Sequence, residues 1–153
     1  MATTTIPVEK ETRDHLRSLG KKGETYDQIL KRLMSLAEYE EFMDRQYERL
    51  KDKKAFVSLE ELWLSYEIRL HKEVAKALAR MEPKLRASIL RGLRVLGNNP
   101  YESRSGVDIV KLRGTKGRQD LFRLRIGNYR AIYGLEGKVV YVTDLFHRGR
   151  GYD

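Results

Sequence analysis

The chain has 153 residues, of which 31 are Lys or Arg and 22 are Asp or Glu, so its formal net charge is +9 at neutral pH. The absence of cysteine excludes a disulfide framework, a thiolate metal site and a cysteine nucleophile. No apolar run approaches the roughly 18 residues of a membrane-spanning helix, and the N-terminus carries no signal-like segment. These features predict a soluble cytoplasmic protein.

The charge is divided unevenly along the chain. Residues 1–62 hold 12 Lys and Arg against 13 Asp and Glu, whereas residues 63–153 hold 19 against 9. A strongly basic segment is typical of a domain that binds a polyanion. We therefore predict two domains, a near-neutral one over residues 1–62 and a basic one over residues 63–153.

Residues 3–8 (TTTIPV) alternate like a short strand. A helix is predicted over residues 9–20, and Thr25 is a candidate N-cap for a second helix, whose apolar residues recur at helical spacing. A lone strand leaves both of its edges unpaired. We therefore expect a second copy of the chain to supply the missing strand, which predicts a homodimer.

The order strand, helix, turn, helix over residues 1–37 resembles the ribbon-helix-helix family of dimeric DNA-binding proteins. The resemblance implies that the ribbon enters the DNA major groove and that the start of the second helix meets a phosphate through free backbone amides. Pro7 departs from the pattern, because related ribbons commonly carry a basic or polar side chain there. The residues implied to contact DNA are Thr3, Thr5, Gly23, Glu24 and Thr25.

Residues 38–52 continue as a long charged helix, followed by an extended piece at residues 55–57. An apolar stripe along such a helix needs a surface to pack on, and the basic domain is the obvious one. The extended piece is expected to add a strand to a sheet edge, with Glu60 or Glu61 near the cationic residues. The predicted contacts with the basic domain are Tyr39, Phe42, Met43, Tyr47, Phe56 and Val57.

The basic domain begins with a predicted strand within residues 63–70 and continues with two helices. The second helix starts at Pro83 and ends before residues 98–100 (NNP). From residue 111 onward the pattern changes to short strands, with turn signals at Gly127-Asn128 and Glu136-Gly137.

Cations occur along these later strands at positions where Thr or Val is usual. Arg123 and Arg125 must share one face of their strand, opposite Phe122 and Leu124. This pattern predicts an α+β domain whose antiparallel sheet has one apolar face for a core and one cationic face for a polyanion.

The phrases NNP, KLRG, LFRLRIGNYRAIY and HRGRGY, following a strand and two helices, resemble the RelE family of toxins over residues 65–153. Those toxins are small metal-independent ribonucleases that cut messenger RNA, typically in the ribosomal A site. The resemblance implies a β-α-α-β-β-β-β domain, mRNA and the ribosome as partners, and no cofactor or metal.

Residues 1–62 then resemble the matching RelB-type antitoxin, which would inhibit the toxin and bind operator DNA for autoregulation. Residues 1–37 would dimerise and bind DNA, and residues 38–62 would wrap the toxin. Antitoxin and toxin are usually separate chains. The chain is therefore interpreted as a fusion, natural or engineered, in which inhibition acts within one chain or between two.

Cleavage of RNA without a metal needs a base for the 2′-hydroxyl, cations for the charge on the phosphate and an acid for the leaving oxygen. The resemblance implies that Arg130 stabilises the phosphate, that Arg148 acts near the leaving group and that Tyr152 stacks on the substrate. Arg123 and Arg125 occupy positions where some relatives carry lysines, one of which is proposed as a base. A guanidinium, with a pKa above about 12, is a poor base.

His147 is the candidate replacement base, because an imidazole with a reference pKa of about 6.5 exchanges protons at neutral pH. A purely structural His147 is an equal alternative. His15 and His71 are expected to be surface or capping groups, and the three scattered histidines predict no metal site. The candidate contacts to RNA or the ribosome are Lys111, Arg113 and Arg118, the last of which has the alternative of a solvated loop charge.

Two other functions stay open at this point. The ParE branch of the same fold acts on gyrase and does not cleave RNA. A dimeric DNA-binding repressor with a degenerate toxin domain is also compatible, because arginines replace the lysines. The density of cations in residues 111–153 favours the ribonuclease.

Overall fold

A computed structural model of the chain describes residues 2–59 and 65–150 and divides the chain into two units, residues 1–41 and 42–153. Glu60 and Glu61, expected near the cationic residues, lie outside the described residues. Helix α2 (Tyr26–Lys51) runs through the boundary between the units as one continuous helix. The predicted long charged helix is therefore confirmed, as an extension of the second helix of the first unit.

The first unit consists of an extended N-terminus, helix α1 (Lys10–Ser18) and the first part of α2. Residues 2–9 adopt no regular secondary structure, and Ile6 and Val8 are 70% and 53% exposed. The predicted strand over residues 3–8 is thus not formed within a single chain. The physical reason is that an isolated strand has no backbone partner for its hydrogen bonds.

The start of α2 follows the capping chemistry predicted at Thr25. The Gln28 amide donates to Thr25 Oγ1 at 3.2 Å, and the Thr25 amide donates to Gln28 Oε1 at 2.9 Å, which forms a reciprocal capping box. Ile29, one turn further along, is buried, and a side chain at Gly20 would collide with it. A larger residue at position 20 would therefore require the Ile29 side chain to shift.

The second unit is built on a six-stranded sheet with strand order β1-β2-β6-β5-β4-β3. Every strand pair is antiparallel except β2–β6, which is parallel, so the predicted all-antiparallel sheet is wrong at this pair. Its strands are β1 (Phe56–Ser58), β2 (Glu67–His71), β3 (Asp108–Lys111), β4 (Leu121–Ile126), β5 (Tyr129–Glu136) and β6 (Val139–His147). Its helices after α2 are the 3-10 turn η1 (Lys53–Ala55), α3 (Lys72–Ala79), α4 (Pro83–Arg94), η2 (Val95–Gly97) and η3 (Arg148–Arg150).

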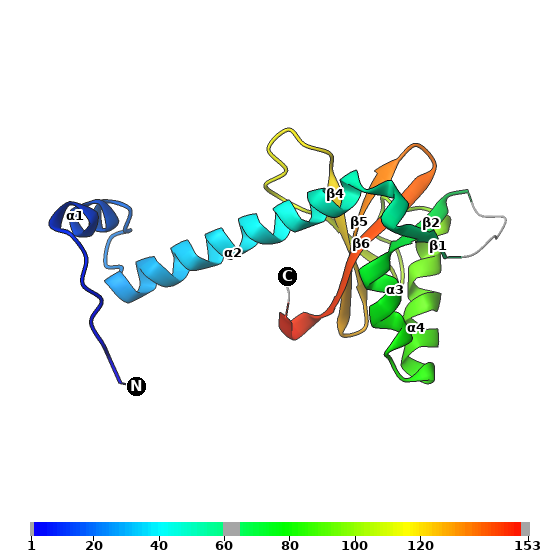
Figure 1. Ribbon diagram of the computed structural model, residues 1–153, viewed down its shortest axis with the longest axis horizontal. Helices are drawn as coiled ribbons and strands as arrows, with labels where there is room; N and C mark the ends of the chain where they lie inside the picture. The colour runs from blue at the N-terminus through cyan, green and yellow to red at the C-terminus, as the bar shows by residue number, and fades with distance from the viewer. Residues whose placement is uncertain (1, 60–64, 151–153) are drawn as a thin grey trace. The chain divides into compact units, whose positions relative to one another are not determined.

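One face of the sheet carries the main core of the second unit. Helices α3 and α4 both pack on this face (Figure 1), with Val74 and Leu78 of α3 and Ile89 and Leu93 of α4 in the core cluster. The order from β2 to β6 is β-α-α-β-β-β-β, as predicted, and β1 adds a sixth strand at the edge beside β2. The buried members of the core cluster all belong to residues 68–145: Ile68, Leu70, Val74, Leu78, Ile89, Leu93, Leu96, Val107, Ile109, Phe122, Leu124, Ala131, Tyr133, Val140, Val142 and Leu145.

The C-terminal half of α2 covers the other face of the sheet. The rings of Phe42 and Phe146 meet edge to face with their centroids 5.9 Å apart. Gly134 of β5 lacks a side chain where Leu50 of α2 approaches, since a Cβ there would lie 3.1 Å from a Leu50 methyl group. The two faces of the sheet are therefore packed independently, one by α3 and α4 and the other by α2.

Two details of the hairpins affect the site. The β4–β5 turn falls at Gly127-Asn128, as predicted, whereas the β5–β6 turn falls at Gly137-Lys138, one residue later than expected. The register of β5 and β6 shifts between Ile132 and Tyr133, which leaves Thr143 as an extra residue in β6. Such a bulge changes which side chains face each side of a strand.

Candidate functional site

The predicted cationic face exists and is the face toward α2. Phe122 and Leu124 belong to the core cluster, and Arg123 and Arg125 alternate with them along β4, so the two arginines point to the opposite side. Arg125 pairs in register with Arg130 of β5. Residues paired in this way lie on the same face of a sheet, so β4 and β5 bring three guanidinium groups together.

Arg130 is 5% exposed, which differs from the open position expected for a phosphate-binding group. Its Nη1 donates to the carbonyl oxygens of Gly127 at 3.3 Å and Tyr129 at 3.1 Å. The side chain therefore curls onto the β4–β5 turn, and Arg130 contributes to the local structure as well as to the charge of the face.

Arg148 is exposed at the end of β6, where η3 begins. Its backbone amide donates to the carbonyl oxygen of Asn128 at 2.7 Å. This bond places Arg148 beside the same turn that Arg130 contacts. Arg125, Arg130 and Arg148 therefore gather at one end of the sheet, although they come from three different strands or strand ends.

The structure does not bring His147 onto this face. His147 pairs with Tyr129, and their rings meet edge to face at 5.4 Å, whereas the adjacent pair is Arg130 with Phe146. Adjacent residues of a strand point to opposite sides, so His147 lies on the core side of the sheet. This geometry does not favour the prediction that His147, exposed beside Arg148 at the end of β6, serves as the base.

The remaining candidates of the basic domain are dispersed. Tyr152 lies outside the described residues. Lys111 forms an ion pair with Asp120 at 2.8 Å, and Arg113 is exposed in the loop that follows β3. Arg118 contacts α2 and its side chain is 33% exposed, so it is not the fully solvated loop charge of the alternative, and its contact with RNA stays a prediction.

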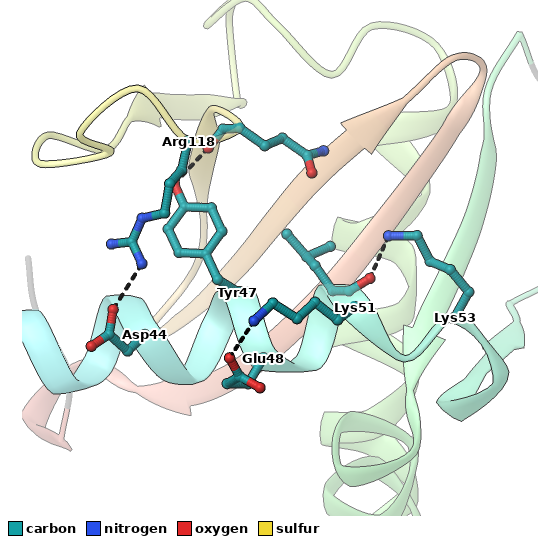
Figure 2. Close-up of a pocket in the computed structure, with 8 residues that line it drawn as sticks. Asp44, Tyr47, Glu48, Lys51, Lys53 and Arg118 are labelled. Atoms are coloured by element: carbon teal, nitrogen blue, oxygen red, sulfur yellow. Dashed lines mark hydrogen bonds and ion pairs between the residues drawn. The ribbon is translucent and has the colours of Figure 1, made fainter.

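Arg118 and Gln119 form a polar contact with α2, shown in Figure 2. The Arg118 guanidinium lies over the Tyr47 ring at 4.0 Å from its centroid and forms an ion pair with Asp44 at 2.8 Å. The Tyr47 hydroxyl donates to the carbonyl oxygen of Gln119 at 2.5 Å. These contacts border a pocket lined by Asp44, Tyr47, Glu48, Leu50, Lys51, Lys53, Arg118 and Gln119.

A buried polar cluster between α2 and β6 was not predicted. Gln46 and Thr143 are fully buried, and the Thr143 hydroxyl donates to Gln46 Oε1 at 2.7 Å. Gln46 Nε2 donates to Asp144 Oδ2 at 3.0 Å, and Arg49 Nη1 donates to the Thr143 carbonyl at 2.7 Å. These partners of Gln46 depend on the bulge in β6, which brings Thr143 and Asp144 toward α2.

The expected contacts between residues 38–62 and the basic domain are largely present. Phe42, Met43, Tyr47 and Phe56 are buried, whereas Val57 is 50% exposed and contacts the basic domain through its strand pairing with Leu70. Tyr39 belongs to the first unit, so its predicted contact is untested. β1 pairs with β2, which confirms the predicted addition of a strand to a sheet edge.

Phe56 packs on two aromatic side chains of the basic domain. Its ring meets those of His71 and Tyr141 edge to face, with centroids 5.3 and 5.0 Å away. His71 is 5% exposed and caps α3, since its Nδ1 accepts from the Glu73 amide at 3.2 Å. From the sequence, His71 is expected to be a surface or capping group. Its capping role agrees with that expectation, whereas its burial differs from a surface position. Burial, followed by the positive charge of Arg49, lowers the pKa of His71.

Some of the residues implied to contact DNA are exposed, whereas others already have hydrogen-bond or ion-pair partners within the chain. Thr3 and Thr5 are exposed in the extended N-terminus, and Gly23 has a φ of 81° in the turn before α2. The Thr25 amide is occupied by Gln28, so it is not the free phosphate donor that was expected. Glu24 forms an ion pair with Arg32 at 3.0 Å, and hydrogen bonds from Arg32 and the Lys21 amide lower its pKa to about 2.

Comparisons with known proteins relate the chain to one class of protein. It is 36% identical to a chain of the archaeal RelE–RelB complex from Pyrococcus horikoshii OT3, over 57% of this chain and 100% of that one, with a TM-score of 0.49. It is 22% identical to a chain of the RelB–RelE antitoxin–toxin complex from Methanococcus jannaschii, over 52% of this chain and 90% of that one, with a TM-score of 0.41. The identity over the full length of the Pyrococcus chain shows that this chain belongs to the RelE–RelB family of toxin–antitoxin proteins.

A model of a family of unknown function (DUF7557) matches residues 3–46. No curated protein matches the chain. Among the described residues, no helix combines the length and the apolar character that crossing a membrane requires.

Proposed function

We propose that the chain is a toxin and its antitoxin in one polypeptide. Residues 63–153 act as a metal-independent, ribosome-dependent endoribonuclease that cleaves mRNA, and residues 1–62 inhibit it. The family relationship supports the toxin–antitoxin role. The ribonuclease activity rests on the three arginines that β4 and β5 present together with Arg148 near the β4–β5 turn.

The observation that carries the proposal is the position of α2 on the cationic face. Phe42, Met43, Tyr47 and Leu50 are buried, and Phe42 and Leu50 approach Phe146 and Gly134 of the sheet. A long RNA cannot occupy a surface that a helix already covers. In this arrangement the segment inhibits by covering the face that would hold the substrate, and β1 adds a second attachment at the sheet edge.

The test compares the intact chain with residues 63–153 expressed alone. The fragment retains every buried member of the core cluster, because that cluster begins at Ile68. We expect the fragment to arrest growth and to cut mRNA on programmed ribosomes, and the intact chain to do neither. The matched control is the fragment carrying Arg148→Ala, which removes an exposed cation without disturbing the core.

The other outcomes separate the alternative functions. Growth arrest with DNA damage and intact transcripts would identify a gyrase inhibitor. A fragment that folds but leaves growth unchanged would identify a repressor with a degenerate toxin domain. Cleavage of transcripts by both the fragment and the intact chain would disprove inhibition by residues 1–62.

The proposal for the first unit is operator binding by a homodimer. It rests on the resemblance of residues 1–37 to the ribbon-helix-helix family and on the exposed, unpaired extended residues 2–9. In a dimer, two such segments can pair as a ribbon. Protection of the gene's own upstream DNA by the intact chain, lost when residues 1–8 are deleted, is the measurement that checks it.

A further inference from the structure

Asp144 is a carboxylate placed within the cationic face. It pairs with Ile132 of β5, and Ile132 pairs with Arg123 of β4, so the three residues form one row across the sheet. The adjacent row consists of Asp108, Arg125, Arg130 and Phe146, in which Asp108 is exposed on the edge strand β3 and none of the described contacts joins it to α2. Among the described strand residues, Asp144 is the carboxylate that shares a row with Arg123.

Three side chains of α2 converge on Asp144. Gln46 Nε2 lies 3.0 Å from Oδ2, Arg49 Nη1 lies 3.4 Å from Oδ1 and Arg45 Nε lies 3.9 Å from Oδ2. The side chain of Asp144 is only 16% exposed as a result. If α2 left the sheet, Asp144 would lose these partners and face solvent beside the arginines.

RNA cleavage requires a proton acceptor on this face, and the arginines are unsuited to that role. A guanidinium keeps its proton at neutral pH because its pKa exceeds about 12, and His147 lies on the opposite side of the sheet. An aspartate with a reference pKa of about 3.9 is ionised at neutral pH and accepts a proton in the transition state.

We propose that Asp144 is the proton acceptor of the ribonuclease reaction and that α2 inhibits the enzyme partly by sequestering this carboxylate. The inference rests on the proposed function. The 2′-oxygen bonds to phosphorus while its proton passes to Asp144, the bond from phosphorus to the 5′-oxygen breaks, and the departing oxygen takes a proton from water. The products are a 2′,3′-cyclic phosphate and a 5′-hydroxyl.

The experiment uses the full chain with α2 detached by Leu50→Glu. Leu50 is 4% exposed against the sheet, and a buried unpaired carboxylate is strongly unfavourable there. The core cluster on the other face contains no residue of α2, so the sheet is expected to stay folded. Near-ultraviolet circular dichroism checks folding, and Phe42→Asp provides a second, independent way to detach the helix.

We expect the detached chain to cut mRNA on programmed ribosomes and the added change Asp144→Asn to slow cleavage by about 100-fold, the lower range for loss of a general base. The same change should remove the acidic limb of the pH–rate profile, and Asp144→Glu should retain that limb. The matched control is Asp120→Asn, an exposed aspartate paired with Lys111, which should leave rate and profile unchanged.

The outcomes distinguish this inference from the proposed function. If the detached chains cut RNA and Asp144→Asn changes neither the rate nor the pH profile, Asp144 is a structural anchor for α2 and the inference is overturned. If both detached chains are folded and cut no RNA, the ribonuclease function fails, and the role of Asp144 fails with it.

Discussion

Arg130 is proposed to contact phosphate, and its side chain is also buried in the folded domain. Its guanidinium donates to two carbonyl groups at the β4–β5 turn, so removing it leaves both without this donor. In the fragment of residues 63–153, we expect Arg130→Ala to lower cleavage by about 100-fold or more and the unfolding free energy by about 1 kcal/mol. Ribosome cleavage assays and denaturant unfolding measure the two effects.

The exposed Arg148 provides the comparison for Arg130. Arg148→Ala should lower cleavage similarly while leaving the unfolding free energy unchanged, because its side chain is exposed. Arg130→Lys should also be impaired, since an ammonium cannot reproduce a two-pronged contact with phosphate. Parent cleavage rates for both alanine variants would show that this cationic face does not act on RNA.

The effect of removing the His147 side chain on cleavage should depend on the side of the sheet where this side chain lies. Because His147 packs beside Tyr129 on the core side, we expect the fragment with His147→Ala to keep its cleavage rate within a few fold and to keep the acidic limb of its pH–rate profile. The rate measured across the acid range checks this. Loss of the acidic limb would restore His147 as the base, and the geometric assignment would then be wrong.

At the scale of elements, Phe56 is the buried side chain of β1, the strand that we propose helps to hold the inhibitory segment on the sheet edge. Phe56 is 7% exposed whereas its neighbour Val57 is 50% exposed. Burying a Phe side chain contributes about 2 kcal/mol. Phe56→Ala in the intact chain should therefore accelerate proteolysis of the segment and raise toxicity, and Val57→Ala should do neither. Equal effects of the two variants would mean that β1 does not hold the segment through Phe56.

The stability of the first turn of α3 should depend on pH, because the His71 side chain that caps it is buried. Burial lowers the pKa of His71 in the folded protein, so the unfolded chain binds a proton more readily. The stability contributed by neutral His71 is complete above the ordinary histidine pKa and is lost as the pH falls through the lower folded value. Protonation would also abolish the acceptor for the Glu73 amide.

Acid should therefore weaken the contact between β1, α3 and β2. The neighbouring charges are Arg49 and Lys72, which oppose protonation, and Glu73 and Asp52, which favour it. We expect the unfolding free energy of the intact chain to drop between pH 7.5 and 5 by less in His71→Asn, which retains a capping acceptor, than in the parent. His15→Asn, in an exposed position of α1, is the control and should behave like the parent.

At the scale of the whole molecule, the first unit is the part that we propose pairs with a second copy of the chain. Helix α1 contains no buried residue. Several large apolar side chains of the first unit are exposed, namely Ile6, Val8, Leu19, Met34 and Leu36. We expect the intact chain to sediment as a dimer and a chain lacking residues 1–8 to sediment as a monomer. A dimer that survives the deletion would place the interface elsewhere.

The sequence determined the elements and the two-sided sheet because both follow from local patterns. Alternation along residues 121–126 places Arg123 and Arg125 opposite Phe122 and Leu124 whatever the rest of the chain does. The capping box at Thr25, the Pro83 helix start and the Gly127-Asn128 turn likewise depend on neighbours within a few residues. Such interactions are readable without the fold.

The tertiary structure decided which groups share the site, because that depends on register and on residues distant in the chain. Gln46 and Thr143 are 97 positions apart, and only the bulge in β6 brings Thr143 and Asp144 toward α2. The burial of Arg130 and the position of His147 on the core side follow from the pairing of β5 with β4 and β6. A strand pattern specifies the alternation of its own side chains but not the partner that each of them meets.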